Sequence, residues 1–145
     1  MPDLLQTAID LAHHAHIGQV DKAGKPYISH PLRVMQQFST TPEKIVGVLH
    51  DAVEDSELTL ADLQQAGFSD DIITAVDAIT KREAEPYEVY LKRVMTNAIA
   101  LRVKIADMTD NMDLSRIAEP TAKDHARLQK YEMTLPRLQQ ALQQL

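Results

Sequence analysis

One short segment of the chain, residues 50–55, concentrates groups that suit metal chemistry. If it is helical, His50 and Glu54 are i,i+4 neighbours, as are Asp51 and Asp55, so one imidazole and three carboxylates share a broad face. Carboxylates this close repel one another unless they are solvated, protonated or facing a cation. The mixture of imidazole and carboxylate suits manganese, iron or zinc better than calcium. The alternative is a solvated acidic helix end with one hydrogen-bonded histidine.

A second segment, residues 103–111, places polar groups on one side of another expected helix. Lys104, Asp107 and Asn111 are spaced i, i+3 and i+7 and therefore share a helical face, with Asp110 adjacent. We expect apolar residues of the same segment to pack on the opposite side. Taken alone, an acid beside a lysine in mid-helix also fits an ordinary surface ion pair.

The third segment, residues 22–31, reads as a loop that leads into a helix. Lys22, Lys25 and Tyr27 offer two cations and a hydroxyl, and His30 stands immediately before Pro31, a residue that favours the first turn of a helix. Such a loop is a candidate anion-binding rim. The alternative is a histidine with a purely structural role at the helix start.

The composition excludes several other kinds of site. The 145 residues include no Cys, which rules out a disulfide scaffold, a thiolate zinc site and a cysteine nucleophile. Only 4 Gly are present and none are clustered, which argues against a Gly-rich phosphate-binding loop. A net charge of −6 argues against nucleic acid as a partner. Without a long apolar run or a basic, apolar leader, we expect no membrane association and a cytoplasmic location.

The elements that must position these groups are predicted to be helical throughout. Apolar spacing, prolines and capping residues predict helices over about 4–16, 31–38, 41–53, 60–66, 70–79, 87–95, 98–117 and 121–145. The third of these carries the 50–55 segment as one continuous helix. Pro136 predicts a kink or a break near Met133 in the last one. We therefore expect an all-α bundle that forms a single domain over residues 1–145.

The three segments together resemble a known family. In chain order they supply His30, then His50-Asp51, then Asp107, the H…HD…D pattern of the HD superfamily of metal-dependent phosphohydrolases. Within that superfamily PYISHP, VLHDAVED and KIADMTDN are similar to the hydrolase domain of RelA/SpoT-type alarmone enzymes and to small alarmone hydrolases. The resemblance extends from about residue 8 to residue 117 and implies an HD-type helical bundle.

The resemblance also implies roles for individual residues. It implies that one divalent metal, most often manganese and otherwise iron, zinc, magnesium or nickel, is bound by His30, His50, Asp51 and Asp107. It implies that Glu54 and Asp55 orient or deprotonate the attacking water. Residues predicted to contact the nucleotide are Lys22, Tyr27, Lys104 and Asn111. These implied roles are consistent with the chemistry of the residues, because such a metal lowers the pKa of water and a nearby carboxylate can take the proton.

Three positions depart from the alarmone pattern, each where that pattern usually has a basic residue: Asp21, Met108 and Asp113. Candidates to restore positive charge, if the fold brings them to the rim, are Lys25, Lys81, Arg82 and Lys104. The predicted function is a metal-dependent phosphohydrolase of a nucleotide, with guanosine 3′,5′-bis(diphosphate) the first choice of substrate. The alternatives are a hydrolase of a less charged nucleotide or phosphate ester, and a non-catalytic nucleotide-binding regulatory module. The oligomeric state stays open.

Overall fold

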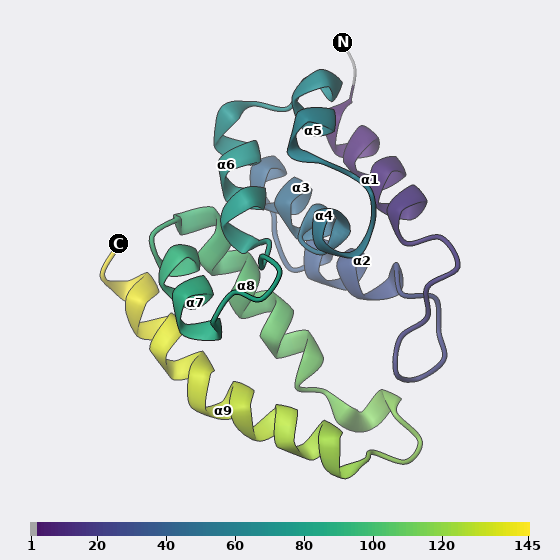
Figure 1. Cartoon of the computed structure of the whole chain (residues 1–145), viewed down its shortest axis with the longest axis vertical. Coiled ribbons are helices and arrows are strands. Elements are labelled where there is room, and N and C mark those ends of the chain that lie inside the picture. Colours follow the sequence, from purple (N-terminus) through teal and green to yellow (C-terminus); the bar gives the residue numbers. More distant parts are fainter. Residues whose placement is uncertain (1–2) are drawn as a thin grey trace.

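The computed structural model describes residues 3–145, and within that range it is built from helices (Figure 1). The bounds of the elements are α1 Leu4–Ala15, α2 Ser29–Gln36, α3 Thr41–Leu49, α4 Ala52–Asp55, α5 Leu60–Ala66, α6 Asp70–Ile79, α7 Tyr87–Met95, α8 Ala98–Asn111, the 3₁₀ turn η1 Leu114–Arg116 and α9 Ala122–Gln143. The expected all-α fold is confirmed. No helix of the described range is long and apolar enough to cross a membrane.

The capping signals of the sequence set several helix ends. Thr59 and Asp62 form the reciprocal capping box that starts α5, and Gly67 ends that helix in the left-handed conformation with φ 100°. Ser69 accepts a hydrogen bond from the Ile72 amide at the start of α6. Local hydrogen bonding therefore fixes these boundaries, which is why the sequence predicts them well.

Helix α3 occupies the centre of the bundle and packs against α1, α2, α6 and α8. Its residues 45–49 are all buried, as expected for a helix surrounded on every side. Gly47 permits the close approach of α2, because a Cβ built there would lie 3.2 Å from the Met35 Cα. The start of α2 lies beside the end of α3, where the ring centroids of His30 and His50 are 5.1 Å apart.

The helix predicted over 41–53 is interrupted. α3 ends at Leu49, His50 and Asp51 form a turn, and α4 starts at Ala52. The His50 Nδ1 lies 2.6 Å from the Gly47 carbonyl oxygen of its own last turn, and that bond helps to end the helix there. The expectation of one continuous helix through residues 50–55 is therefore wrong, although the Asp55 amide still donates to the Asp51 carbonyl oxygen at 3.0 Å.

Two other expected boundaries also differ. Helix α8 ends at Asn111 rather than near residue 117, and the Asp113 side chain accepts the Ser115 amide to start the 3₁₀ turn. Helix α9 continues through Pro136, so the break considered near Met133 does not occur. Proline removes one backbone hydrogen bond. Packing of α9 against α7 and α8, with Leu138 fully buried, keeps the helix continuous.

Candidate metal centre and substrate cavity

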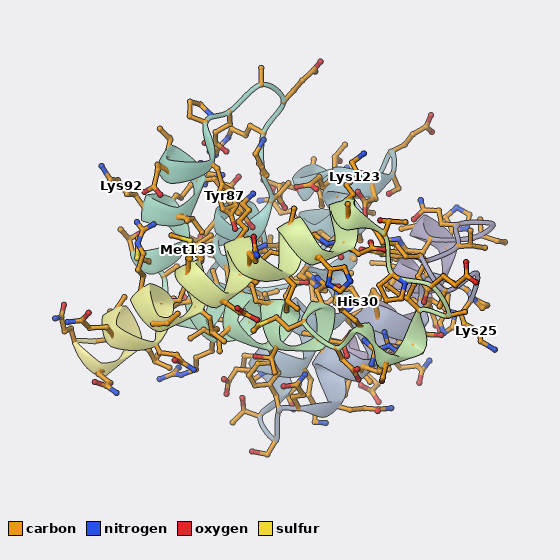
Figure 2. The ribbon with its side chains drawn as sticks, turned by 90° about the horizontal axis from the view of Figure 1, so that it is seen from below. Lys25, His30, Tyr87, Lys92, Lys123 and Met133 are labelled. Carbon is orange, nitrogen blue, oxygen red and sulfur yellow. The ribbon has the colours of Figure 1, made fainter. Side chains whose placement is uncertain are left out.

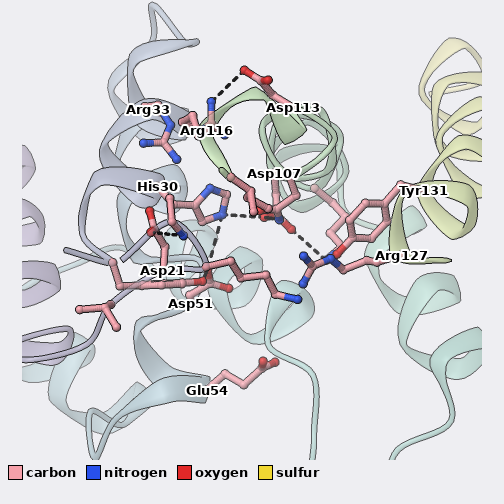
Figure 3. Close-up of a pocket in the computed structure, with 17 residues that line it drawn as sticks. Asp21, His30, Arg33, Asp51, Glu54, Asp107, Asp113, Arg116, Arg127 and Tyr131 are labelled. Atoms are coloured by element: carbon pink, nitrogen blue, oxygen red, sulfur yellow. Dashed lines mark hydrogen bonds and ion pairs between the residues drawn. The ribbon is translucent and has the colours of Figure 1, made fainter. Parts of the chain in front are cut away.

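Four predicted ligands meet at one point in the bundle. His30 comes from the first turn of α2, His50 and Asp51 from the turn after α3, and Asp107 from α8. Figure 3 shows His30, Asp51 and Asp107 turned toward one another. One ligand atom from each of them lies within 4.8 Å of the other three. The His30 Nε2 is 2.8 Å from the Asp107 Oδ1, and the His50 Nε2 is 3.0 Å from the Asp51 Oδ2. Two imidazoles and two carboxylates around one centre suit a divalent transition metal.

Both imidazoles are oriented by a hydrogen bond at Nδ1, the ring nitrogen that faces away from the predicted metal site. The His30 Nδ1 lies 2.6 Å from the Asp110 Oδ2, and the His50 Nδ1 lies 2.6 Å from the Gly47 carbonyl oxygen. A carbonyl only accepts, so His50 carries a proton on Nδ1, and the carboxylate of Asp110 favours the same arrangement in His30. Each Nε2 is thereby directed at the common centre, which is the orientation that a metal requires.

The charges of the cluster fit a cation at its centre. Burial lowers the pKa of His50, but Asp51 and Asp107 outweigh burial and raise that pKa well above its usual value. Burial raises the pKa of Asp107, but Lys104 and His50 outweigh it and hold that pKa well below its usual range. The carboxylates therefore stay ionised and attract a positive charge. A proton on imidazole and a dication compete for this place.

Asp107 is fixed by the two neighbours that helical spacing predicts for it. Lys104 donates to its Oδ2 at 3.0 Å and Asn111 donates to its Oδ1 at 3.0 Å. Asp107 is buried, with 6% of its surface exposed, so the alternative of an ordinary surface ion pair is wrong. The Asp107 carboxylate instead contacts both histidines, and residues of its own helix orient it.

The four predicted metal ligands lie at the edge of a cavity of about 510 Å³. Loop 20–27, α2, the turn after α3, α8, η1 and α9 all contribute to its wall. In Figure 2, His30 is seen between the start of α9, marked by Lys123, and the loop that carries Lys25. Predicted substrate and catalytic residues that line the cavity are Lys22, Tyr27, Glu54, Lys104 and Asn111. Its size is that of a small-molecule site.

Tyr27 connects loop 20–27 to the predicted metal ligands. Its hydroxyl donates to the Asp51 Oδ2 at 2.6 Å. Burial and the charge of Asp51 raise the pKa of Tyr27 far above its usual value, so the phenol stays protonated and remains a donor. In this structure Tyr27 therefore orients a metal ligand as well as lining the cavity.

The two acids predicted to act together lie in different surroundings. Glu54 lines the cavity, and its Oε1 accepts the Lys81 amide at 2.9 Å. Asp55 is not among the cavity-lining residues, and its main-chain oxygen accepts from the Gln19 side chain at 3.0 Å. Burial raises the pKa of Glu54. Burial, followed by the charges of Asp51 and Glu54, raises the pKa of Asp55 to about 6.

The cavity contains cations that sequence reasoning missed. Arg33, Arg116 and Arg127 line it, whereas Lys25, Lys81 and Arg82 do not. Arg33 follows His30 by three residues on the same helix, and that spacing was the one available signal for it. Arg116 and Arg127 carry no comparable local signal, because tertiary packing of η1 and α9 brings them to the wall.

The three departures from the alarmone pattern have local structural roles. Asp21 accepts the Ala23 and Lys25 amides within its own loop, each at 2.9 Å. Asp113 accepts from Ser115 and from Arg116, and Met108 is fully buried in the core. Asp21 and Asp113 nevertheless line the cavity. The wall carries five basic side chains (Lys22, Arg33, Lys104, Arg116, Arg127) and five acidic ones (Asp21, Asp51, Glu54, Asp107, Asp113).

The sequence is similar to known proteins over most of its length. A GTP pyrophosphokinase of Streptomyces coelicolor is 33% identical over 91% of this chain, which covers 17% of that protein. A guanosine-3′,5′-bis(diphosphate) 3′-pyrophosphohydrolase of Vibrio cholerae is 29% identical over 92% of this chain, which covers 21% of it. The bifunctional (p)ppGpp synthase/hydrolase SpoT of Escherichia coli is 28% identical over 74% of this chain. No protein-family model matches.

The fold has a counterpart among solved structures. A structure described as a metazoan ortholog of SpoT that hydrolyzes ppGpp aligns with 98% of this chain and 87% of its own, with a TM-score of 0.78 and 20% sequence identity. The chain spans only about a fifth of the length of the curated relatives that it matches. The resemblance indicated by the three motifs is thus confirmed in sequence over one segment of those proteins, and in fold over the whole described chain.

Proposed function

We propose that this chain, a relative of the RelA/SpoT-type alarmone enzymes, is a metal-dependent phosphohydrolase of the HD type that acts on a nucleotide. The single observation that carries the proposal is the convergence of His30, His50, Asp51 and Asp107 at the floor of a nucleotide-sized cavity. Our first choice of reaction is release of pyrophosphate from the 3′ position of guanosine 3′,5′-bis(diphosphate). We also propose that residues 1–145 act as one catalytic domain, located in the cytoplasm, where nucleotide pools are found.

Hydrolysis rather than pyrophosphate transfer is favoured by this chain's own residues. The relatives carry both kinds of name, but each name describes a protein several times longer than this chain. Here His30 and several carboxylates line the cavity, and His50 completes the ligand cluster with them, an arrangement that serves activation of water. Only 4 glycines are present, and none form a loop suited to holding a nucleoside triphosphate.

The proposed metal is a divalent cation, with manganese first and iron, zinc, magnesium or nickel as the alternatives. When bound, it supplies Lewis-acid chemistry: it polarises a phosphoryl oxygen and lowers the pKa of water. His30, His50, Asp51 and Asp107 would hold it. Tyr27 orients Asp51 through a 2.6 Å hydrogen bond, and Lys104 and Asn111 orient Asp107.

The carboxylates outside the ligand set handle the proton. Water attacks the phosphorus bonded to the 3′ oxygen, the new P–O bond forms, and the bond from that phosphorus to the 3′ oxygen breaks. Glu54 lines the cavity and takes the proton of the attacking water. The 3′ oxygen leaves with the electron pair and takes up a proton. Asp55, with its pKa raised to about 6, is exposed outside the cavity lining and exchanges its proton with solvent.

The charge of the wall supports an anionic substrate. Five basic and five acidic side chains line the cavity, so a bound dication gives it a formal excess of two positive charges. Lys22, Lys104 and Arg127 offer charge-assisted hydrogen bonds to phosphate oxygens. The acids Asp21 and Asp113 in the cavity wall are the observation that favours the second candidate, a less charged nucleotide or phosphate ester.

A substrate panel tests the proposal. Purified protein is incubated with manganese and, side by side, with guanosine 3′,5′-bis(diphosphate), GTP, GDP and simple phosphate esters, and pyrophosphate and orthophosphate are measured separately. We expect pyrophosphate from the bis(diphosphate) and loss of turnover on chelation. Orthophosphate from simple nucleotides alone would favour the second candidate. Tight binding of a nucleotide with no product from any compound would favour a regulatory module.

A further inference from the structure

One buried carboxylate outside the metal ligands joins three separate elements. Asp110 lies on α8 with 8% of its side chain exposed. Its Oδ2 is 2.6 Å from the His30 Nδ1, and its Oδ1 accepts the Arg33 Nε at 2.9 Å. The Arg116 Nη2 donates to the Asp110 carbonyl oxygen at 2.7 Å. One residue thus fixes a predicted metal ligand and two arginines.

The two arginines are held in place but keep donors for a ligand. Arg33 gives Asp110 its Nε and Nη2, and Arg116 gives its Nη2 to Asp110 and its Nη1 to Asp113. A guanidinium has five N–H donors, so each side chain retains some that these bonds do not use. About a third of each arginine side chain is exposed, and both line the cavity. Fixed, planar guanidiniums suit two-point binding of phosphate.

The position of the pair sets it apart from the reacting end of the cavity. Figure 3 shows Arg33 and Arg116 on the same side of His30, with Glu54 on the opposite side. If the phosphate that is cleaved binds beside Glu54, the side of the cavity with Arg33 and Arg116 is free to bind another part of the same molecule. A nucleotide with phosphates at two positions presents such a second anion.

We propose that Arg33 and Arg116, held by Asp110, form a second phosphate subsite that binds the diphosphate of the nucleotide that is not cleaved. The subsite selects nucleotides phosphorylated at two positions over those phosphorylated at one. This inference rests on the proposed function only in that the cavity takes a nucleotide. Asp113 limits the subsite, because it occupies one donor of Arg116 through a 3.0 Å ion pair.

Because Arg116 and Asp113 form an ion pair, we expect substitutions of these two residues to have opposite effects on the subsite. Asp113 is 46% exposed, and exposed ion pairs contribute little stability, so a phosphate can displace this carboxylate from Arg116. Removing the charge of Arg116 weakens the subsite, whereas removing the charge of Asp113 strengthens it. The effect of Asp113→Asn depends on Arg116 being present, as a double-mutant cycle detects.

The test compares two substrates, guanosine 3′,5′-bis(diphosphate) and guanosine 3′-diphosphate, through the ratio of their kcat/KM values. We expect Arg33→Met and Arg116→Met each to lower this preference roughly tenfold or more, from loss of charge-assisted hydrogen bonds. Asp113→Asn should raise it, and should have no effect in the presence of Arg116→Met. Arg102→Met, an exposed arginine of α8 outside the cavity, is the matched control. Metal content is measured in every variant.

The outcomes separate this inference from the proposed function. If the wild-type protein turns over both substrates and the arginine variants keep its preference, the subsite is wrong and the proposed function stands. If the wild-type protein turns over neither, the proposed function fails. Binding of inorganic pyrophosphate to metal-free protein then decides on the subsite: Arg116→Met must weaken it roughly tenfold relative to Arg102→Met, and equal affinities overturn the inference.

Discussion

At the scale of single residues, Glu54 and Asp55 show how neighbours in sequence can differ in chemistry. Glu54 faces the cavity and is held by the Lys81 amide, whereas Asp55 lies outside the lining with a pKa raised to about 6. Of the two, Glu54 is placed to meet a water beside the metal ligands. The pair for which the resemblance implies a shared role is thus divided between one carboxylate in the cavity wall and one outside the lining.

Replacing Glu54 tests its role directly. We expect Glu54→Gln to lower kcat by roughly 10²–10⁴-fold, because the amide cannot accept the proton of the attacking water. Metal content should equal that of the wild-type protein, since Glu54 is outside the ligand set. Turnover is measured by pyrophosphate release, and metal by elemental analysis.

The matched control is Glu57→Gln, an exposed glutamate that does not line the cavity. It should keep the wild-type rate. A normal rate in Glu54→Gln would remove Glu54 from the mechanism, and a loss of metal in that variant would mean that Glu54 supports the ligands instead.

At the scale of elements, the start of α9 is tied to the loop across the cavity. Asp124 closes the capping box of α9 by accepting the Thr121 amide at 2.8 Å. Its other oxygen accepts from Lys22 at 3.1 Å and from Arg127 at 3.2 Å. A single carboxylate therefore starts a helix and connects it to a loop more than a hundred residues earlier. Two walls of the cavity depend on this contact.

The contact has a defined pH dependence. Hydrogen bonds from Thr121 and Lys22 lower the pKa of Asp124 from 3.8 to about 2. An acid with a lowered pKa in the folded state adds stability above its unfolded pKa, and this is lost as the pH falls. We expect Asp124→Asn to lower the Tm by a few degrees at pH 7. The difference from wild type should shrink between about pH 4 and pH 2.

Thermal unfolding followed by circular dichroism across this pH range checks the prediction. Asp71→Asn is the control, because Asp71 is an exposed acid in the first turn of α6 and does not line the cavity. A Tm difference for Asp124→Asn that stays constant down to pH 2 would show that its carboxylate charge is not what stabilises the contact.

At the scale of the whole molecule, the metal centre joins parts of the chain that no local interaction connects. His30 and Asp107 are in contact across 77 residues of sequence, and His50 and Asp107 across 57. A ligand that binds only the folded state stabilises that state by mass action. A metal held by these residues would link α2, the turn after α3 and α8 more firmly than their packing alone.

Metal removal should therefore lower the stability of the whole domain. We expect manganese at a hundredfold excess over its Kd to raise the Tm of metal-free protein by roughly 5–10 °C. Asp51→Ala, which removes one of the four ligands, should lose both this shift and turnover. The measurement is differential scanning fluorimetry with manganese titrated into chelator-treated protein. An undiminished shift in Asp51→Ala would make the ligand assignment wrong.

The sequence by itself predicted most of the helical elements and the four residues that meet in the candidate metal centre. Capping residues such as Thr59 and Gly67 act within one or two turns, and the spacing of Lys104, Asp107 and Asn111 follows from the helical repeat, so both can be predicted locally. The break at His50 could not, because it depends on a histidine side chain returning to its own helix while its Nε2 meets a distant acid.

Only the tertiary structure decided which charges line the cavity. Arg33, Arg116 and Arg127 come from three separate elements and line the same cavity, where Asp110 holds the first two and Asp124 holds Arg127. The same packing divides Glu54 from Asp55 and leaves Lys25, Lys81 and Arg82 outside the cavity. A side chain's distance from a site depends on contacts between segments far apart in sequence. For that reason the sequence specified the chemistry of the metal centre, and the fold specified the cavity around it.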